Sequence, residues 1–89
     1  MDKQQLRTTL EQLHSELEQT QSLDPEAQAL LRDLQDDIQT LLQHAAPEAQ
    51  HYRPLGVRLR TATERFETSH PALTWSMQQV LDILSRMGI

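Results

Sequence analysis

The sequence predicts an all-α domain of three to four amphipathic helices. Apolar residues recur at alternating steps of four and three, which places them on one face of a helix. Strong helix formers such as Leu, Gln, Glu, Ala and Arg dominate, and β-branched residues are sparse. Two glycines and four prolines are too few for a loop-rich chain. We expect an N-terminal antiparallel hairpin with coiled-coil-like packing, followed by a C-terminal pair of helices.

Length and composition limit the classes of protein that the chain can represent. The 89 residues suffice for one domain, 1–89, with a modest core built mostly from aliphatic side chains, because aromatics make up only 3%. The absence of cysteine excludes disulfides and thiolate metal sites. No apolar run approaches the roughly 20 residues needed to span a bilayer, and the polar start MDKQQLRTTL lacks the apolar segment of a signal peptide. We therefore expect a cytoplasmic protein.

The first two helices are expected over residues 2–20 and 25–44. The first has a narrow apolar stripe typical of coiled-coil packing, formed by Leu6, Leu10, Leu13 and Leu17. Between the helices, Asp24 is expected to cap the second helix and Pro25 to occupy its first position. The short connection predicts antiparallel neighbours. The second helix has a broader apolar face, formed by Ala27, Leu30, Leu31, Leu34, Ile38, Leu41, Leu42 and Ala45.

Residues 45–54 are expected to form the longest break, because Pro47 and Pro54 bracket a segment without apolar periodicity. A short helical turn after Pro47 is the alternative. The third helix is expected over residues 55–69, with Gly56 tolerated in its first turn and an apolar stripe of Leu55, Leu59, Ala62 and Phe66.

Pro71 separates the third helix from a fourth, expected over residues 71–87. Proline disfavours helical geometry at His70, which favours a turn with Ser69 or His70 as the cap of the fourth helix. The alternative is one long kinked helix, because the apolar phase continues across the proline with a single four-residue insertion. The fourth helix has a broad apolar face formed by Leu73, Met77, Val80, Leu81, Ile83, Leu84 and Met87. Gly88 is expected to end it in a left-handed conformation, with Ile89 folding back on Leu84.

Charge is divided unevenly along the chain. Residues 1–50 carry three basic and ten acidic side chains, whereas residues 51–89 carry five basic and three acidic ones. We interpret this division as an acidic hairpin docking beside a basic second half, within one chain or between chains. The competing hypothesis is phosphate or nucleic-acid binding by Arg53, Arg58, Arg60 and Arg65. The net charge of −5 and the lack of interleaved aromatic residues argue against a nucleic-acid partner.

Three Glu-x-x-His pairs motivate the hypothesis of a metal site: Glu11 with His14, Glu48 with His51, and Glu67 with His70. Residues three apart share a helix face and can hold one ion, as in di-metal carboxylate bundles. The expected inner faces are all apolar and supply no further carboxylates. We therefore expect no metal site.

Catalysis and membrane binding find no support in the sequence. No serine lies in a nucleophile elbow or beside a base with an orienting acid, and no glycine-rich phosphate loop is present. We expect neither an enzyme nor a cofactor. The acidic, Gln-rich polar face of the first helix is a poor match for an anionic membrane surface.

Trp75 is the best candidate for a functional residue. It falls opposite the apolar stripe of the fourth helix, near Gln78, Gln79 and Asp82. Either it covers the Pro71 corner or packs on the third helix, or it is exposed and marks an interaction surface. Val57 is a similar residue outside its stripe. Tyr52 either covers the core or makes an exposed contact; with Trp75 and Val57 it completes our candidate interaction set.

The segment ERFETSHPALT, the ending LSRMGI, the opening MDKQQLRTTLEQLHSELEQ and the segment Leu30–Leu42 together resemble domain-of-unknown-function family 4404. The resemblance covers nearly the whole chain, and its more specific parts are ERFE-x-SHP and the closing Met-Gly-Ile. It implies a bacterial, cytoplasmic, single-domain helical protein, and it implies no activity.

We conclude that a non-catalytic helical interaction or self-assembling scaffold module is the favoured function. The broad apolar faces of the second and fourth helices favour a homodimer, because one chain would leave part of them uncovered. One alternative is a metal-binding bundle that uses His14, His51 or His70. Another is an acidic adaptor or regulator of a nucleic-acid-binding protein.

Overall fold

The computed structural model describes residues 2–20, 24–44 and 48–88. This part of the chain contains four helices and no strand: α1 (Asp2–Gln19), α2 (Pro25–Gln43), α3 (Ala49–Phe66) and α4 (Pro71–Arg86). The prediction of an all-α fold is therefore confirmed. None of these helices is long and apolar enough to cross a bilayer.

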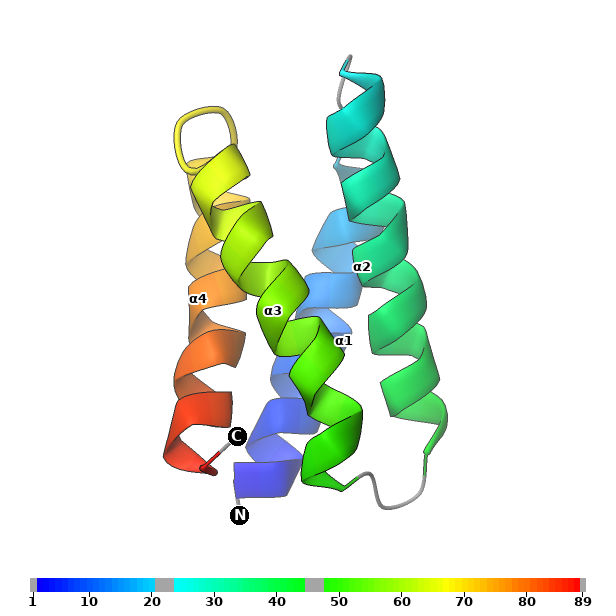
Figure 1. Cartoon of the computed structure of the whole chain (residues 1–89), viewed down its shortest axis with the longest axis vertical. Helices are drawn as coiled ribbons and strands as arrows, with labels where there is room; N and C mark the ends of the chain where they lie inside the picture. The colour runs from blue at the N-terminus through cyan, green and yellow to red at the C-terminus, as the bar shows by residue number, and fades with distance from the viewer. Residues whose placement is uncertain (1, 21–23, 45–47, 89) are drawn as a thin grey trace.

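The four helices form an antiparallel bundle with principal extents of 36 × 22 × 19 Å (Figure 1). α1 packs against α2 and α4, and α3 packs against the same two helices. α1 and α3 therefore lie diagonally across the core, with α3 in front and α1 behind in Figure 1. The N-terminal hairpin and the C-terminal helix pair are both present, and α1 and α4 close the bundle.

α1 and α2 follow the prediction closely. The four leucines of the α1 stripe are buried, as are five residues of α2: Ala27, Leu31, Leu34, Ile38 and Leu41. Asp24 caps α2 in extended geometry, and its Oδ1 atom accepts a hydrogen bond of 3.1 Å from the backbone N–H of Glu26. Pro25 occupies the first turn. The predicted core position of Ala45 lies outside the described residues.

The start of α3 differs from the prediction, because the helix begins at Ala49 and not at Leu55. The backbone N–H of Glu48 donates a hydrogen bond of 2.8 Å to Nδ1 of His51, which stabilises the first turn. Pro54 lies inside the helix and removes the donor to the Gln50 carbonyl. Gln50 is exposed, so water can replace that donor. Gly56 consequently lies mid-helix and not in the first turn.

Tyr52 is a core residue, so the core alternative is correct and its inclusion in the candidate interaction set is wrong. Only 6% of Tyr52 is exposed. The apolar pattern of α3 begins one turn earlier than predicted, because Tyr52 precedes Leu55 and Leu59 on the same face.

A turn separates α3 from α4, so the kinked-helix alternative is wrong. α3 ends at Phe66, the chain turns through residues 67–69, and Pro71 occupies the first position of α4. His70 is the N-cap residue, although its side chain makes no capping hydrogen bond. Its ring lies edge-on against Phe66, with centroids 5.4 Å apart. The proline therefore outweighs the continuous apolar phase.

The C-terminal end of α4 confirms the predicted role of Gly88. Its φ of 80° lies in the left-handed region, and its backbone N–H donates to the Ser85 carbonyl at 3.1 Å. The predicted contact of Ile89 with Leu84 lies outside the described residues.

The single chain covers most of the broad apolar faces of α2 and α4. Most of the described side chains of these faces are buried, and the others pack partly buried against the core, namely Leu30, Leu42, Leu81 and Met87. The exposed large hydrophobic residues among those described are Val57 and Trp75. The original support for a homodimer is therefore weaker, and the homodimer stays a prediction.

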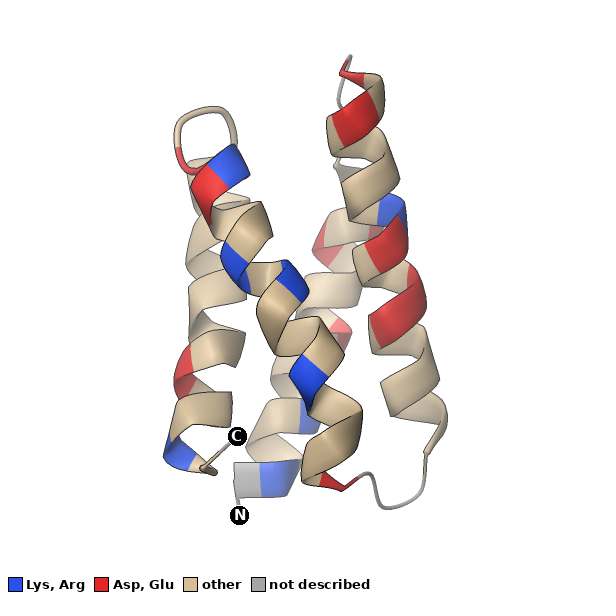
Figure 2. Ribbon diagram, in the orientation of Figure 1, with Lys and Arg blue, Asp and Glu red and all other residues tan. Residues whose placement is uncertain are grey.

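Ion pairs join the acidic hairpin to the basic second half within one chain. Figure 2 shows acidic residues along α2 and arginines along α3. Arg58 pairs with Asp37 of α2, and Arg65 pairs with the cap residue Asp24 and, at 3.6 Å, with Glu26. The docking interpretation of the uneven charge is thus confirmed.

Candidate functional site

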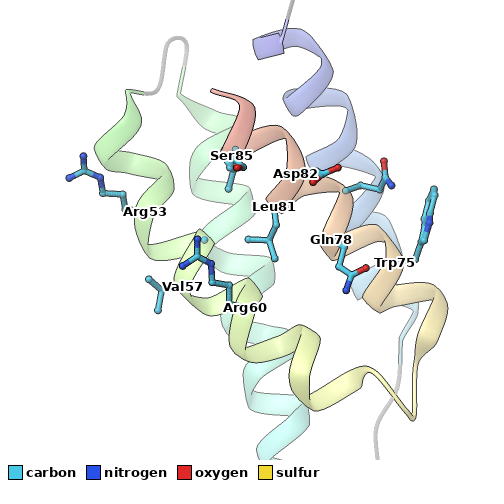
Figure 3. Close-up of a pocket in the computed structure, with 11 residues that line it drawn as sticks. Arg53, Val57, Arg60, Trp75, Gln78, Leu81, Asp82 and Ser85 are labelled. Atoms are coloured by element: carbon cyan, nitrogen blue, oxygen red, sulfur yellow. The ribbon is translucent and has the colours of Figure 1, made fainter. Parts of the chain in front are cut away.

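A groove of about 720 Å³ lies between the outer faces of α3 and α4 (Figure 3). Gly56 opens this groove because it contributes no side chain where α3 meets α4. A Cβ atom at this position would lie 3.9 Å from Cδ1 of Leu84. Leu81, which is half-buried, supplies apolar surface to the groove, and the buried Leu84 borders it.

Val57 and Trp75 lie on opposite sides of this groove, with Leu81 between them in Figure 3. Val57 is 66% exposed and Trp75 is 63% exposed. Both lie on the sides of their helices that point away from the core, which explains why packing does not cover them. Trp75 neither covers the Pro71 corner as a buried residue nor packs into α3, so the exposed alternative is correct.

Trp75 also borders a second, smaller hollow on the side of α4 that faces α1. This hollow has a volume of about 80 Å³ and is lined by Thr9, Gln12, Ser76 and Gln79 as well as Trp75. Ser76 also donates a hydrogen bond of 2.9 Å from its Oγ atom to Oε1 of Glu16. This bond ties α4 to α1 and holds the helix that carries Trp75 in place.

Arginine and polar side chains surround the apolar part of the groove. Arg53 and Arg60 come from α3, and they flank Val57 along that helix (Figure 3). Gln78, Asp82 and Ser85 come from α4. The α3 edge of the groove is therefore basic, and the α4 edge is polar with one acid.

The clear pKa shifts among the described residues lie outside this groove. A hydrogen bond from Arg65, with another from the backbone of Glu26, lowers the pKa of Asp24 below its ordinary value. Burial raises the pKa of Tyr52 above 10.0. Both shifts have structural causes, a helix cap and a core position. The groove itself offers apolar and charged contacts suited to binding.

The three Glu-x-x-His pairs do not converge on a metal site in the described part of the chain, which has no cluster of three or more metal-binding side chains. His14 pairs with Glu18 at 3.2 Å and not with Glu11. His51 accepts from the backbone of Glu48, and Nδ1 of His70 lies 2.9 Å from Oγ of Ser69. Each histidine thus has a local structural contact.

The structure brings together two of the three predicted interaction residues, Val57 and Trp75, and places Tyr52 in the core. The sequence reasoning missed Arg53 and Arg60 as parts of the same site, because it grouped all the arginines of this segment as a phosphate-binding hypothesis. The spacing of Arg53, Val57 and Arg60 places them on one side of a helix, and this pattern could have grouped the two arginines with Val57.

Comparison with known proteins identifies one family. A family model described as a domain of unknown function, DUF4404, matches residues 6–89. The search of curated proteins finds no match, and the search of solved structures finds none either.

Proposed function

The chain belongs to the DUF4404 family of domains of unknown function, and because that description names no activity, we propose from the geometry that it is a non-catalytic protein-interaction module. The observation that carries the proposal is the position of Val57 and Trp75, two large exposed apolar side chains on one groove. A surface that combines an exposed tryptophan with arginine is typical of interface hot spots.

The rest of the described bundle supports assigning the interaction to this groove. Among the described residues, the apolar stripe of α1 is buried and the apolar side chains of α2 are buried or packed partly buried against the core, so they offer a partner little surface. The groove, in contrast, is lined by the exposed Val57 and Trp75 and by the half-buried Leu81. A partner that covers it would remove Val57 and Trp75 from water with little rearrangement of the bundle.

A photo-crosslinking amino acid tests whether the groove contacts another protein. We expect the crosslinker at Gln78, in the groove, to form a discrete adduct in the native cell, and Trp75→Ala to remove that adduct. The matched control is the same crosslinker at Gln39, an exposed position on α2. Equal labelling at both positions, or an adduct that Trp75→Ala leaves unchanged, would contradict the proposal.

The mass of the adduct separates the two forms of this function. A product of twice the chain mass indicates self-assembly, as in the predicted homodimer. A product of any other mass indicates a different protein and agrees with the adaptor alternative. Either product supports the interaction function.

A further inference from the structure

The arginines of α3 form two pairs on opposite flanks of the helix. Arg58 and Arg65 are seven residues apart, and so are Arg53 and Arg60, so each pair lines one side over two helical turns. The first pair is occupied within the bundle, because Arg58 binds Asp37 and Arg65 binds Asp24. Along this flank α3 therefore already binds α2 at Asp37 and the N-cap residue of α2 at Asp24.

The second pair lies along the groove without such a helix. The side chains of Arg53 and Arg60 are exposed, and no hydrogen bond or ion pair joins them to another residue in the described parts of the chain. In Figure 3, Arg60 lies between Val57 and Leu81, and Arg53 extends from the same helix with its guanidinium pointing away from α4. The groove therefore combines apolar surface from Val57, Leu81 and Trp75 with two arginines on its α3 edge that form no ion pair with the described residues.

A helix is the element that fits this arrangement. The groove runs between two antiparallel helices, and an amphipathic helix can lay its apolar face into such a groove. The rise from Arg53 to Arg60 is about 10.5 Å along the axis of α3. A helix lying alongside α3 matches this distance with two acidic residues seven positions apart on one side of its apolar stripe.

A second copy of the chain is a poorer occupant for reasons of charge. Val57 and Trp75 are the exposed large apolar side chains among the described residues, so within that part of the chain a second copy offers this same face. Two such faces would bring four arginines together and only two acids from the groove lining, the Asp82 of each copy. The acidic faces of α1 and α2 carry the needed charge, but their apolar stripes are buried.

We propose that the groove between α3 and α4 binds an amphipathic helix of a different protein, with acidic side chains along the edge that meets Arg53 and Arg60. This inference rests on the proposed interaction function and specifies the chemistry of the partner. Val57, Leu81 and Trp75 contact the apolar stripe of that helix, and the two arginines fix its register and direction.

Three synthetic peptides test this proposal directly. Each is a helix about 18 residues long, without tryptophan, that carries a leucine stripe at steps of three and four. The peptides differ only at two positions, seven apart beside the stripe, which hold Glu, Gln or Lys. Because Trp75 is the single tryptophan of the chain, its fluorescence reports binding at the groove.

We expect the Glu peptide to bind about tenfold more tightly than the Gln peptide, and the Lys peptide to bind more weakly than both. The preference for Glu should fall at high salt, because the charges are exposed. The double variant Arg53→Gln/Arg60→Gln should remove the preference and still bind through the apolar stripe. Arg32→Gln, an exposed control on α2, should keep it.

Equal affinity for the Glu and Gln peptides, or a preference that survives the double arginine variant, overturns the acidic-helix proposal but leaves the interaction function intact. If light scattering shows that the native protein is a dimer and that Trp75→Ala is a monomer, the acidic-helix proposal is also overturned, because the groove then binds a second copy of the chain. If none of the peptides binds, the proposal fails, and the crosslinking experiment then decides separately whether the groove contacts any protein.

Discussion

Arg65 of α3 binds the Oδ2 atom of Asp24, the residue whose Oδ1 atom caps α2. One carboxylate therefore caps the start of α2 and also connects α2 to α3. Asp24 therefore takes part both in a helix cap, which depends on neighbouring residues, and in a contact with Arg65, which is 41 positions away.

The Asp24 carboxylate predicts a loss of stability in acid. Arg65 lowers the pKa of Asp24 in the folded state. The stabilisation that the ionised carboxylate gives to the fold is therefore fully present above the ordinary pKa of 3.8 and is lost as the pH falls through the lower folded value. Asp24→Asn keeps an N-cap side chain but removes the charge. Urea unfolding should show a gap between the native protein and this variant at pH 7 that closes in strong acid. A gap of constant size down to pH 2 would rule out the ion pair as its cause.

We predict that a substitution of Gly56 stabilises the bundle and also narrows the groove. Gly56→Ala should raise the free energy of unfolding by about 0.5–1 kcal/mol, because alanine has a higher helix propensity than glycine in a helix interior. Its Cβ atom would meet Leu84 at an ordinary contact distance of 3.9 Å. Denaturant unfolding measures the gain. Gly88→Ala is the contrasting control and should destabilise by about 1 kcal/mol, because Gly88 has a positive φ.

We predict that a substitution of Thr74 also raises the free energy of unfolding. Its Oγ1 atom is buried and has no hydrogen-bond partner among the described residues. Thr74→Val keeps the shape of the side chain and removes the unsatisfied hydroxyl, so it should stabilise by about 1 kcal/mol. Ser76→Ala, which deletes the donor to Glu16, should destabilise in the same assay. A loss of stability in Thr74→Val would mean that the hydroxyl has a partner in solution.

Trp75→Ala should leave the fold almost unchanged. The side chain is mostly exposed, so we expect a change in the free energy of unfolding within about 0.5 kcal/mol. Phe66→Ala, which empties a fully buried site, should cost about 3–5 kcal/mol. Circular dichroism with thermal unfolding distinguishes the two. A large loss of helicity in Trp75→Ala would place the indole in the core and remove the basis for the interaction surface.

Local sequence signals were sufficient for most of the helices. The leucine stripe of α1, the Asp24-Pro25 start of α2 and the break at Pro71 depend on neighbouring residues, so periodicity and capping chemistry predict them. The same approach failed at the start of α3, where Pro54 was interpreted as a boundary. The burial of Tyr52 and the first-turn contact of His51 outweigh the single hydrogen bond that Pro54 removes.

The candidate groove could be predicted only in part. Val57 and Trp75 stood out because they fall outside the apolar stripes of their helices. Nothing local shows that they line one groove, because that depends on the angle at which α3 and α4 pack and on the missing side chain of Gly56 against Leu84.

The sequence by itself determined the fold class, the core positions of the helices and the caps at Asp24 and Gly88, because these follow from interactions within a few residues. Only the tertiary structure decided which arginines are neutralised. Arg58 and Arg60 are two residues apart, yet α2 lies beside the first and the open groove beside the second. Which flank of a helix meets a neighbour is set by the packing of the whole bundle, and no local pattern records it.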